Sequence, residues 1–185
     1  MNIGLTQRVL YHKGRAYDSI EHGWYSYLKD HTLTFIANRT DQDFKKIASK
    51  LDALIITGGD DSMLRRAVEI KLARHMMEYQ KPVIGVCHGC FLLTELLGGI
   101  IGETITHLDT SHSVYYFGEE HSVNSYHNLA IKKLHTSGTE LVVDPDGNCE
   151  AWIDNKIAGV MWHPERMKIA WLPDEIQQLF FKETK

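Results

Sequence analysis

Short apolar runs that alternate with segments of helical spacing constrain the fold of this chain more than any other feature. Each run is rich in isoleucine or valine and ends at a turn or polar residue, as strands buried on both faces of a sheet do. The runs are NIGL at the start, LTFIAN around Phe35, DALIITGG around Ile55 and KPVIGVC around Ile84. Their order predicts βαβ units, and therefore an α/β fold with a doubly wound, mostly parallel sheet.

Two segments between these runs have the spacing of amphipathic helices. In DSIEHGWYSYLKD, one stripe consists of Ile20, Trp24, Tyr27 and Leu28. In DSMLRRAVEIKLARHMMEY, the corresponding stripe consists of Leu64, Val68, Leu72 and Met76. Asp61 or Ser62 is the expected cap of the second helix.

The second half of the chain has a different pattern of apolar and turn residues. From Ile100 to about Trp162, short runs separated by turn residues predict antiparallel strands or hairpins added to the sheet. LPDEIQQLFFKETK predicts a closing helix with Pro173 in its first turn. Because the 185 residues contain no internal repeat, low-complexity tract or linker, we expect a single domain over residues 1–185.

Composition excludes several classes of partner. Acidic and basic residues are mixed along the chain, and the net charge of -4 gives no broad electrostatic footprint for nucleic acid. The apolar run at the start is too short for a signal peptide, and no stretch approaches the length of a membrane span. We therefore expect a cytoplasmic protein without nucleic-acid or membrane partners, in which the 3 cysteines are thiols.

KPVIGVCHGCFLLTELLGG joins a buried strand, a Gly-x-Cys-x-Gly turn and an amphipathic helix. This is the order of a nucleophile elbow with cysteine in place of serine. A nucleophile at the tip of so tight a turn requires that Gly85 and Gly89 carry no side chains. The following helix N-terminus favours the thiolate of Cys87, and the backbone N–H of His88 is available to an oxyanion.

Three other interpretations of Cys87 and Cys90 remain open at this point. The turn alone is equally consistent with a buried structural thiol. A redox C-x-x-C pair also occupies a strand–helix junction, although a thioredoxin-like chain carries it after an early strand and here it follows the fourth. A zinc site lacks a second pair at ligand spacing, because Cys149 is isolated and has no H-x₃₋₅-H partner. We interpret Cys149 as a residue without a functional role.

GVMWHPER favours the nucleophile over these alternatives. A short apolar strand leads to His163, Pro164 ends the strand, and Glu165 follows. In extended backbone His163 and Glu165 project to the same side, so the carboxylate can orient the imidazole while its other nitrogen faces a thiol. The order Cys87, His163, Glu165 therefore predicts a catalytic triad.

The elbow and His-Pro-Glu together resemble the class I glutamine amidotransferase superfamily, whose triad is Cys, His and Glu. The resemblance spans nearly the whole chain and implies the flavodoxin-like fold of that family. In ITGGDD, residues 56–61, it implies that the N–H of Gly59 joins that of His88 in the oxyanion hole and that Gly58 lies in the substrate pocket. The implied acyl transfer through a thioester requires no metal and no organic cofactor.

SVNSYHN, residues 122–128, resembles the V-N-S-x-H segment of the γ-glutamyl-γ-aminobutyrate hydrolase branch. The resemblance implies that Ser125 and Tyr126 hold the glutamyl head group and that Asn124 and His127 line the same pocket. Without it, the residues indicate only a polar loop.

The elbow departs from the family at Phe91, where members that use glutamine often have a Gln that binds the α-amino acid end. This departure favours a small-molecule γ-glutamyl conjugate as substrate. The suggested example is γ-glutamyl-CDP-amidate, the substrate of stand-alone hydrolases in capsule-sugar pathways.

Rival functions remain. A glutaminase subunit that passes ammonia to a separate synthetase is disfavoured because the chain has no synthetase domain and lacks that Gln. A redox-sensing module would need a reversible disulfide between Cys87 and Cys90. The intracellular-protease-like branch shares the elbow but takes its acid from an early glutamate, which His-Pro-Glu makes unnecessary.

TQRVLYHKGR, after the first strand, groups Arg8, His12, Lys13 and Arg15 in what we expect to be one loop. Loops after the carboxyl ends of strands line the ligand crevice in doubly wound sheets. A solvated basic loop is the plainer interpretation. The functional interpretation is that Arg8 and Lys13, with Arg15 as an additional candidate, bind the phosphates of an anionic leaving group.

Overall fold

The parallel strands form one half of a 9-stranded sheet in the described part of the chain. The computed structural model describes residues 1–180, apart from the side chains of 105–109. The parallel strands are, in spatial order, β4 (Thr32–Ile36), β1 (Asn2–Thr6), β5 (Ala53–Ile56), β6 (Val83–Val86) and β11 (Ile157–Val160). In chain order this is the 2-1-3-4-5 arrangement of flavodoxin-like folds, so the predicted doubly wound parallel sheet is confirmed.

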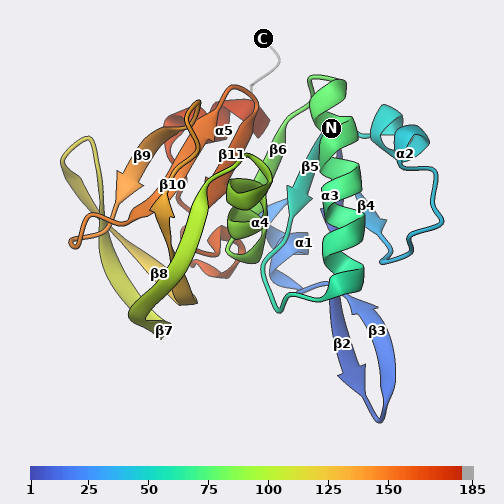
Figure 1. Ribbon diagram of the computed structural model, residues 1–185, viewed down its shortest axis with the longest axis horizontal. Helices are drawn as coiled ribbons and strands as arrows, with labels where there is room; N and C mark the ends of the chain where they lie inside the picture. The colour runs from blue at the N-terminus through green and yellow to red at the C-terminus, as the bar shows by residue number, and fades with distance from the viewer. Residues whose placement is uncertain (181–185) are drawn as a thin grey trace.

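Antiparallel strands extend the sheet beyond β11, as the turn-rich second half predicts. They are β10 (Cys149–Asp154), β8 (Glu119–Lys133), β7 (Ile100–Tyr116) and β9 (Thr139–Val143). Because β9 pairs with both β7 and β10, these strands close on one another and form a lobe beside the parallel half (Figure 1). SVNSYHN lies within β8, so its interpretation as a loop was wrong.

Helices cover both faces of the parallel half. On one face, the apolar core includes side chains of α2 (Phe44–Lys50), α3 (Met63–Glu78) and α4 (His88–Leu96). On the other face, it includes side chains of α1 (Gly23–Tyr27) and α5 (Asp174–Phe180). Figure 1 shows α3 and α4 in front of the sheet and α1 behind it. The two layers of helices leave the carboxyl ends of the strands open.

The predicted α3 is confirmed, with a shift of its buried face. Ser62 is its N-cap and its hydroxyl accepts a hydrogen bond of 3.2 Å from the N–H of Arg65. Val68, Leu72 and Met76 are buried as expected, but Leu64 is 44% exposed and Arg65 is fully buried in its place. An ionic side chain therefore occupies a position of the apolar stripe.

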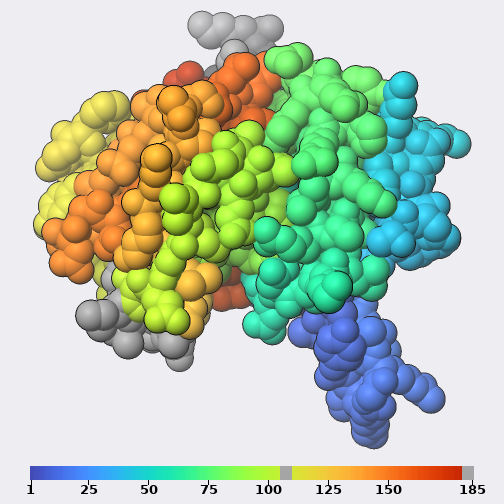
Figure 2. Space-filling model, in the orientation of Figure 1, coloured from blue at the N-terminus to red at the C-terminus, as the bar shows by residue number. Residues whose placement is uncertain are grey.

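The segment after β1 is a β-hairpin, so the prediction of a basic loop was wrong. β2 (Arg8–His12) and β3 (Arg15–Ser19) pair through a two-residue turn at Lys13 and Gly14. Both turn residues have positive φ, 49° and 72°, as the tight turns that match strand twist require. The hairpin projects from the body (Figures 1 and 2), and it shortens the predicted first helix to α1.

Two smaller features complete the fold. Pro173 directly precedes α5, and its carbonyl accepts hydrogen bonds from the N–H groups of Ile176 and Gln177. The end of the predicted closing helix, 181–185, lies outside the described residues. Among the described helices, none is both long and apolar enough to span a membrane.

Candidate active site

Cys87 occupies a strained turn between β6 and α4. Its φ is 50° and its ψ is -103°, a conformation that costs a non-glycine residue energy and occurs preferentially at functional sites. A Cβ on Gly85 would lie 2.2 Å from the carbonyl oxygen of Gly89, and one on Gly89 would lie 2.1 Å from that of Ile56. The tight turn predicted from Gly-x-Cys-x-Gly is therefore present, and neither glycine can carry a side chain.

Neighbouring strands deliver Cys87 and His163 to the same cleft. Val86 and Val160, the last residues of β6 and β11, are register partners. The N–H of Cys87 continues this ladder with a 2.8 Å hydrogen bond to the carbonyl of Val160. Both Cys87 and His163 line an open cleft of ≈ 380 Å³. A thiol and an imidazole thus share one cavity at the carboxyl ends of the strands, where ligands bind in such sheets.

His163 contacts Glu165, but the backbone between them differs from the sequence prediction. Pro164–Arg166 forms a 3₁₀ turn, η1, so this stretch is not extended. The turn still brings Nδ1 of His163 to 2.7 Å from Oε1 of Glu165. A carboxylate can only accept, so the imidazole carries its proton on Nδ1 and leaves Nε2 to face other groups.

Two residues of other elements fix the position of His163. A Cβ on Gly58 would lie 2.2 Å from Cε1 of the imidazole, so the ring occupies the space of the missing side chain. The side-chain amide of Asn124, on β8, accepts from the N–H of His163 and donates to its carbonyl, each at 2.8 Å. Asn124, which the resemblance assigned to substrate, thus holds the backbone of His163.

Burial raises the pKa of the Cys87 thiol to about 11, and a hydrogen bond from the His88 backbone offsets only part of that shift. We expected the helix N-terminus to favour the thiolate. Burial, which favours the neutral thiol, has the larger effect on the pKa of Cys87. In the free protein Cys87 is a thiol near neutral pH. A reaction of Cys87 as a nucleophile would therefore need a base that removes its proton.

A buried polar network connects the turn at Gly59 with the start of α4. The side chain of Arg65 donates to the carbonyl oxygens of Thr57, Gly58 and Asp60, which surround Gly59. Its Nε also lies 2.7 Å from Oε1 of Glu69, and neither side chain is exposed. A buried guanidinium thereby holds the carbonyls on both sides of Gly59, which lines the cleft.

Glu69 extends the network to His88, the residue after Cys87. Its Oε2 lies 2.8 Å from Nε2 of His88, and its Oε1 accepts a 2.7 Å hydrogen bond from the hydroxyl of Thr6. Burial alone would raise the pKa of Glu69, but the bonds from His88 and Arg65 outweigh it and lower the pKa below 4.5. Gly59 and His88, the predicted oxyanion donors, both line the cleft.

The sequence did not reveal Arg65 and Glu69. The signal was available, because Arg65, Val68, Glu69 and Leu72 share one helix face at i, i+3, i+4 and i+7. An arginine and a glutamate on the stripe that contains valine and leucine indicate a buried ion pair.

The other predicted substrate residues have different environments. Tyr126 and His127 line the cleft together with Phe91, whereas Ser125 is fully buried and does not line it. The ring of Tyr126 meets the imidazole of His163 edge-on, with centroids 5.4 Å apart. Arg166 lies over the ring of Tyr126, 4.6 Å from its centroid. The lining of the cleft therefore includes an aromatic ring next to a guanidinium.

Arg8 and Lys13 lie at opposite ends of the hairpin. Arg8, at its base, bonds to Glu21, which is also bound by Arg166 through Nε and Nη2. Burial would raise the pKa of Glu21, but Arg166 and Arg8 lower it. Arg8 also lies close to Gly59, since a Cβ there would be 3.1 Å from its Nε. Lys13 and Arg15 are exposed at the tip.

Cys90 has a different environment from Cys87. It is fully buried inside α4, and its sulfur would lie 2.6 Å from a Cβ on Gly159 of β11. Burial raises the pKa of Cys90 well above that of an ordinary thiol. Cys90 thus packs against the sheet, as a structural cysteine does.

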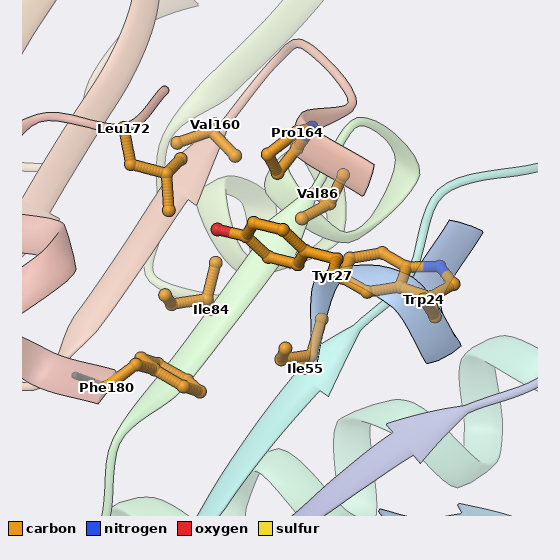
Figure 3. Close-up of a pocket in the computed structure, with 9 residues that line it drawn as sticks. All are labelled: Trp24, Tyr27, Ile55, Ile84, Val86, Val160, Pro164, Leu172 and Phe180. Atoms are coloured by element: carbon orange, nitrogen blue, oxygen red, sulfur yellow. The ribbon is translucent and has the colours of Figure 1, made fainter. Parts of the chain in front are cut away.

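A separate apolar cavity lies behind the turn that carries His163 and Glu165 (Figure 3). Its volume is ≈ 10 Å³, about the size of one water, which is too small for a substrate. Figure 3 shows the ring of Tyr27 in the middle of its lining residues, with Pro164 and Trp24 beside it. Burial raises the pKa of Tyr27, and the charge of Glu165 adds to the shift. α1 thus supports η1 from the side away from the cleft.

Comparisons with known proteins agree with this architecture. Residues 15–182 match the family model described as glutamine amidotransferase class-I. The chain is 29% identical to the gamma-glutamyl-CDP-amidate hydrolase of Campylobacter jejuni, over 90% of each chain. It is 28% identical to the glutamine-hydrolyzing GMP synthase of Staphylococcus carnosus, over 78% of this chain and 28% of that protein. A glutamine amidotransferase from Thermotoga maritima has the same fold, with a TM-score of 0.71, 12% identity and coverage of 89% and 76% of the two chains.

Proposed function

Because the chain belongs to the class I glutamine amidotransferase family, whose members are enzymes that act on C–N amide bonds, we propose that it hydrolyses a γ-glutamyl amide. In this proposal Cys87 is the nucleophile, His163 the general base and acid, and Glu165 the group that orients His163. The observation that carries it is the convergence of the elbow thiol and the His163–Glu165 pair on one cleft.

The proposed reaction begins with a thiol. Nε2 of His163 takes the proton of Cys87 as Sγ attacks the γ-carbonyl carbon, since the pKa of about 11 keeps the thiol protonated until then. The N–H groups of Gly59 and His88 stabilise the tetrahedral oxyanion. The imidazolium then protonates the departing nitrogen, the C–N bond breaks, and a γ-glutamyl thioester remains. Water, deprotonated by the same imidazole, releases glutamate and restores the thiol.

The proposed substrate is a conjugate larger than glutamine. Phe91 lines the cleft at the place where glutamine-using members often have a Gln. With that contact absent, binding energy must come from the leaving group, and such remote contacts can increase kcat as well as lower KM. The relative from Campylobacter jejuni is named for γ-glutamyl-CDP-amidate, which fits this requirement. We propose a nucleotide-linked γ-glutamyl amide of this kind.

The phosphates of such a conjugate need cationic partners. Arg166 lines the cleft, and Arg8 is joined to it through their shared partner Glu21. A guanidinium binds phosphate oxygens in pairs. We propose that Arg8 binds the anionic leaving group and that Lys13, farther out on the hairpin, contributes through its charge. Tyr126 and His127 are proposed to contact the glutamyl group.

The test is a panel of γ-glutamyl amides, with released glutamate as the readout. It should include γ-glutamyl-CDP-amidate, a neutral aryl γ-glutamyl amide and free glutamine. We expect the nucleotide conjugate to have the highest kcat/KM and glutamine the lowest. If glutamine matches the best conjugate, the chain is a glutaminase subunit, which its similarity to a glutamine-hydrolyzing GMP synthase would then explain. If no amide is cleaved, the hydrolase proposal fails.

A further inference from the structure

Three metal-ligating side chains converge in the antiparallel lobe. We propose that His112 on β7, His127 on β8 and Glu150 on β10 bind a divalent transition metal ion, zinc by their chemistry, that ties these strands together. Their ligand atoms all lie within 4.8 Å of one another. Two imidazoles and one carboxylate are a ligand set that zinc accepts in proteins.

The distances between the ligand atoms are close to those that one ion imposes. Nε2 of His112 lies 3.6 Å from Oε2 of Glu150, and Nε2 of His127 lies 3.8 Å from the same oxygen. Both separations are too long for hydrogen bonds. Ligands at about 2.0–2.1 Å from a tetrahedral zinc ion lie about 3.3–3.4 Å apart. The two separations from Glu150 therefore exceed this spacing by only about 0.2–0.5 Å, and the two imidazole nitrogens lie within 4.8 Å of each other.

The protonation of His127 fits a ligand. Its Nδ1 lies 2.8 Å from the carbonyl oxygen of Leu129. A carbonyl only accepts, so the neutral ring carries its proton on Nδ1 and presents the lone pair of Nε2 toward Glu150. A histidine that binds a metal is oriented in this way, by donation from its other nitrogen to a backbone carbonyl or a carboxylate.

Burial strengthens the case for a cation between these groups. Glu150 is 1% exposed and His127 is 3% exposed. Their burial limits the competition of water for a bound ion, and Nε2 of His127 faces Oε2 of Glu150 at 3.8 Å. A divalent ion between them converts this contact into two coordinate bonds.

The position of the cluster indicates that a bound ion would stabilise the antiparallel lobe. β8 and β10 share one registered pair in the described residues, Cys149 with Ile131, whereas β7 and β8 pair extensively. An ion held by residues of all three strands would supply a link where the ladder is sparse. His127 also lines the cleft and contacts Phe91 edge-on at 6.2 Å, so the link would fix one wall of the cleft.

The experiment measures zinc binding to the whole protein directly. The chain, stripped with a chelator and dialysed, is titrated with zinc alone against a chromophoric competitor, and bound metal is counted by elemental analysis. We expect one zinc per chain and a rise in Tm on its addition, because a ligand that binds only the folded state stabilises it. Zinc that binds with less than half an equivalent, or that leaves Tm unchanged, would overturn the proposal.

Matched variants locate the ion. His112→Asn and Glu150→Gln should each weaken zinc binding by more than the roughly 10–100-fold that loss of an outer-sphere partner costs. Cys87→Ala and His163→Ala remove a thiol and an imidazole that line the cleft but lie outside the cluster, and His75→Ala removes a partly exposed histidine of α3. All three should keep full binding. Loss of zinc in Cys87→Ala, with retention in His112→Asn, would place the ion in the active-site cleft and refute the cluster. Circular dichroism checks that each variant is folded. If a variant does not fold, the wild-type titration still tests whether the protein binds zinc.

Discussion

The side-chain amide of Asn124 bonds to His163 twice, once to its N–H and once to its carbonyl, both at 2.8 Å. Since β8 carries Asn124 and His163 lies in the segment that follows β11, this pair joins the antiparallel lobe to the parallel half of the sheet. With His163 as the proposed general base, Asn124 would act on the reaction by holding this histidine in place.

Asn124→Asp should therefore lower kcat and leave KM almost unchanged. The carboxylate keeps the acceptor for the N–H of His163 but repels its carbonyl, so the imidazole shifts relative to Cys87. A displacement of about 1 Å costs roughly 10²-fold in rate. Steady-state kinetics with a γ-glutamyl amide gives both constants. A rise in KM at constant kcat would instead support direct contact of Asn124 with substrate. Asn128→Asp, at an exposed position of the cleft wall, is the control.

Cys87→Ala should abolish turnover, by about 10⁴-fold or more, because the nucleophile acts as a unit with its base. Cys90→Ala should keep most of the activity, since its sulfur is fully buried against β11. Glutamate release by the two purified variants is compared at equal folded fraction, measured by circular dichroism. Equal loss in both variants would favour the redox interpretation of the C-x-x-C pair.

The alkylation of Cys87 should depend on pH as expected for a protonated thiol. With a pKa of about 11, the thiolate fraction rises about tenfold per pH unit from pH 7 to 9.5 and does not level off. The rate of iodoacetamide labelling, corrected with Cys87→Ala for the other cysteines, measures this fraction. A plateau below pH 8 would mean that Cys87 and His163 already form an ion pair in the free protein.

Glu69→Gln should reduce both activity and stability. Removing one charge of the buried Arg65–Glu69 pair typically costs about 3–5 kcal/mol of unfolding free energy. Because the folded-state pKa of Glu69 lies below 4.5, its contribution is present above that pH and is lost as the pH falls through the folded pKa. Urea unfolding from pH 7 down to 3.5 should show a steeper acid decline in wild type than in the variant.

Glu95→Gln is the matched control for this experiment. Glu95 pairs with Arg66 at 2.7 Å, but both side chains are more than a third exposed. An exposed pair contributes about 0–1 kcal/mol, so the control should resemble wild type. If the two variants lose equal stability, the network around the oxyanion donors has no special role.

Arg8→Gln should raise KM for a phosphate-bearing γ-glutamyl amide far more than for a neutral one, and Lys13→Gln should have a smaller effect. The reason is position, because Arg8 lies close to Gly59 whereas Lys13 lies at the tip of the hairpin. In wild type, KM for the phosphate substrate should rise with salt, as screening predicts. Arg15→Gln, also near the tip, serves as the charge control. If Arg8→Gln raises KM by the same factor for the phosphate-bearing and the neutral substrate, the hairpin has no part in recognition of the phosphates.

Local patterns in the sequence predicted most of the fold and the elbow. The runs that became β1, β4, β5 and β6 are short and continuous, and buried parallel strands require this pattern. Gly85 is required by its contact with Gly89, four residues along the chain, and Gly89 is required by its contact with Ile56 on the adjacent strand β5. The sequence therefore contained enough information to predict them.

The sequence did not predict the features that depend on distant partners. Asn124 meets His163 across the sheet, and its neighbours in sequence indicate only polarity. The basic stretch forms a hairpin in which Lys13 and Gly14 both adopt positive φ. The sequences of β2 and β3 show no alternation of apolar and polar residues that would predict these strands. His112, His127 and Glu150 come from separate strands, so no ligand spacing reveals their cluster.

The ladder that joins β6 to β11 ties Cys87, the proposed nucleophile, to the central strands of the sheet. The hydrogen bond from the Cys87 N–H to Val160 can open only when these central strands separate, so this amide should exchange with solvent about as slowly as the core does. Heat should then end catalysis and melt the sheet in one step, without a temperature range in which the chain is folded but inactive. For this enzyme, residual activity after heating would measure the surviving native population.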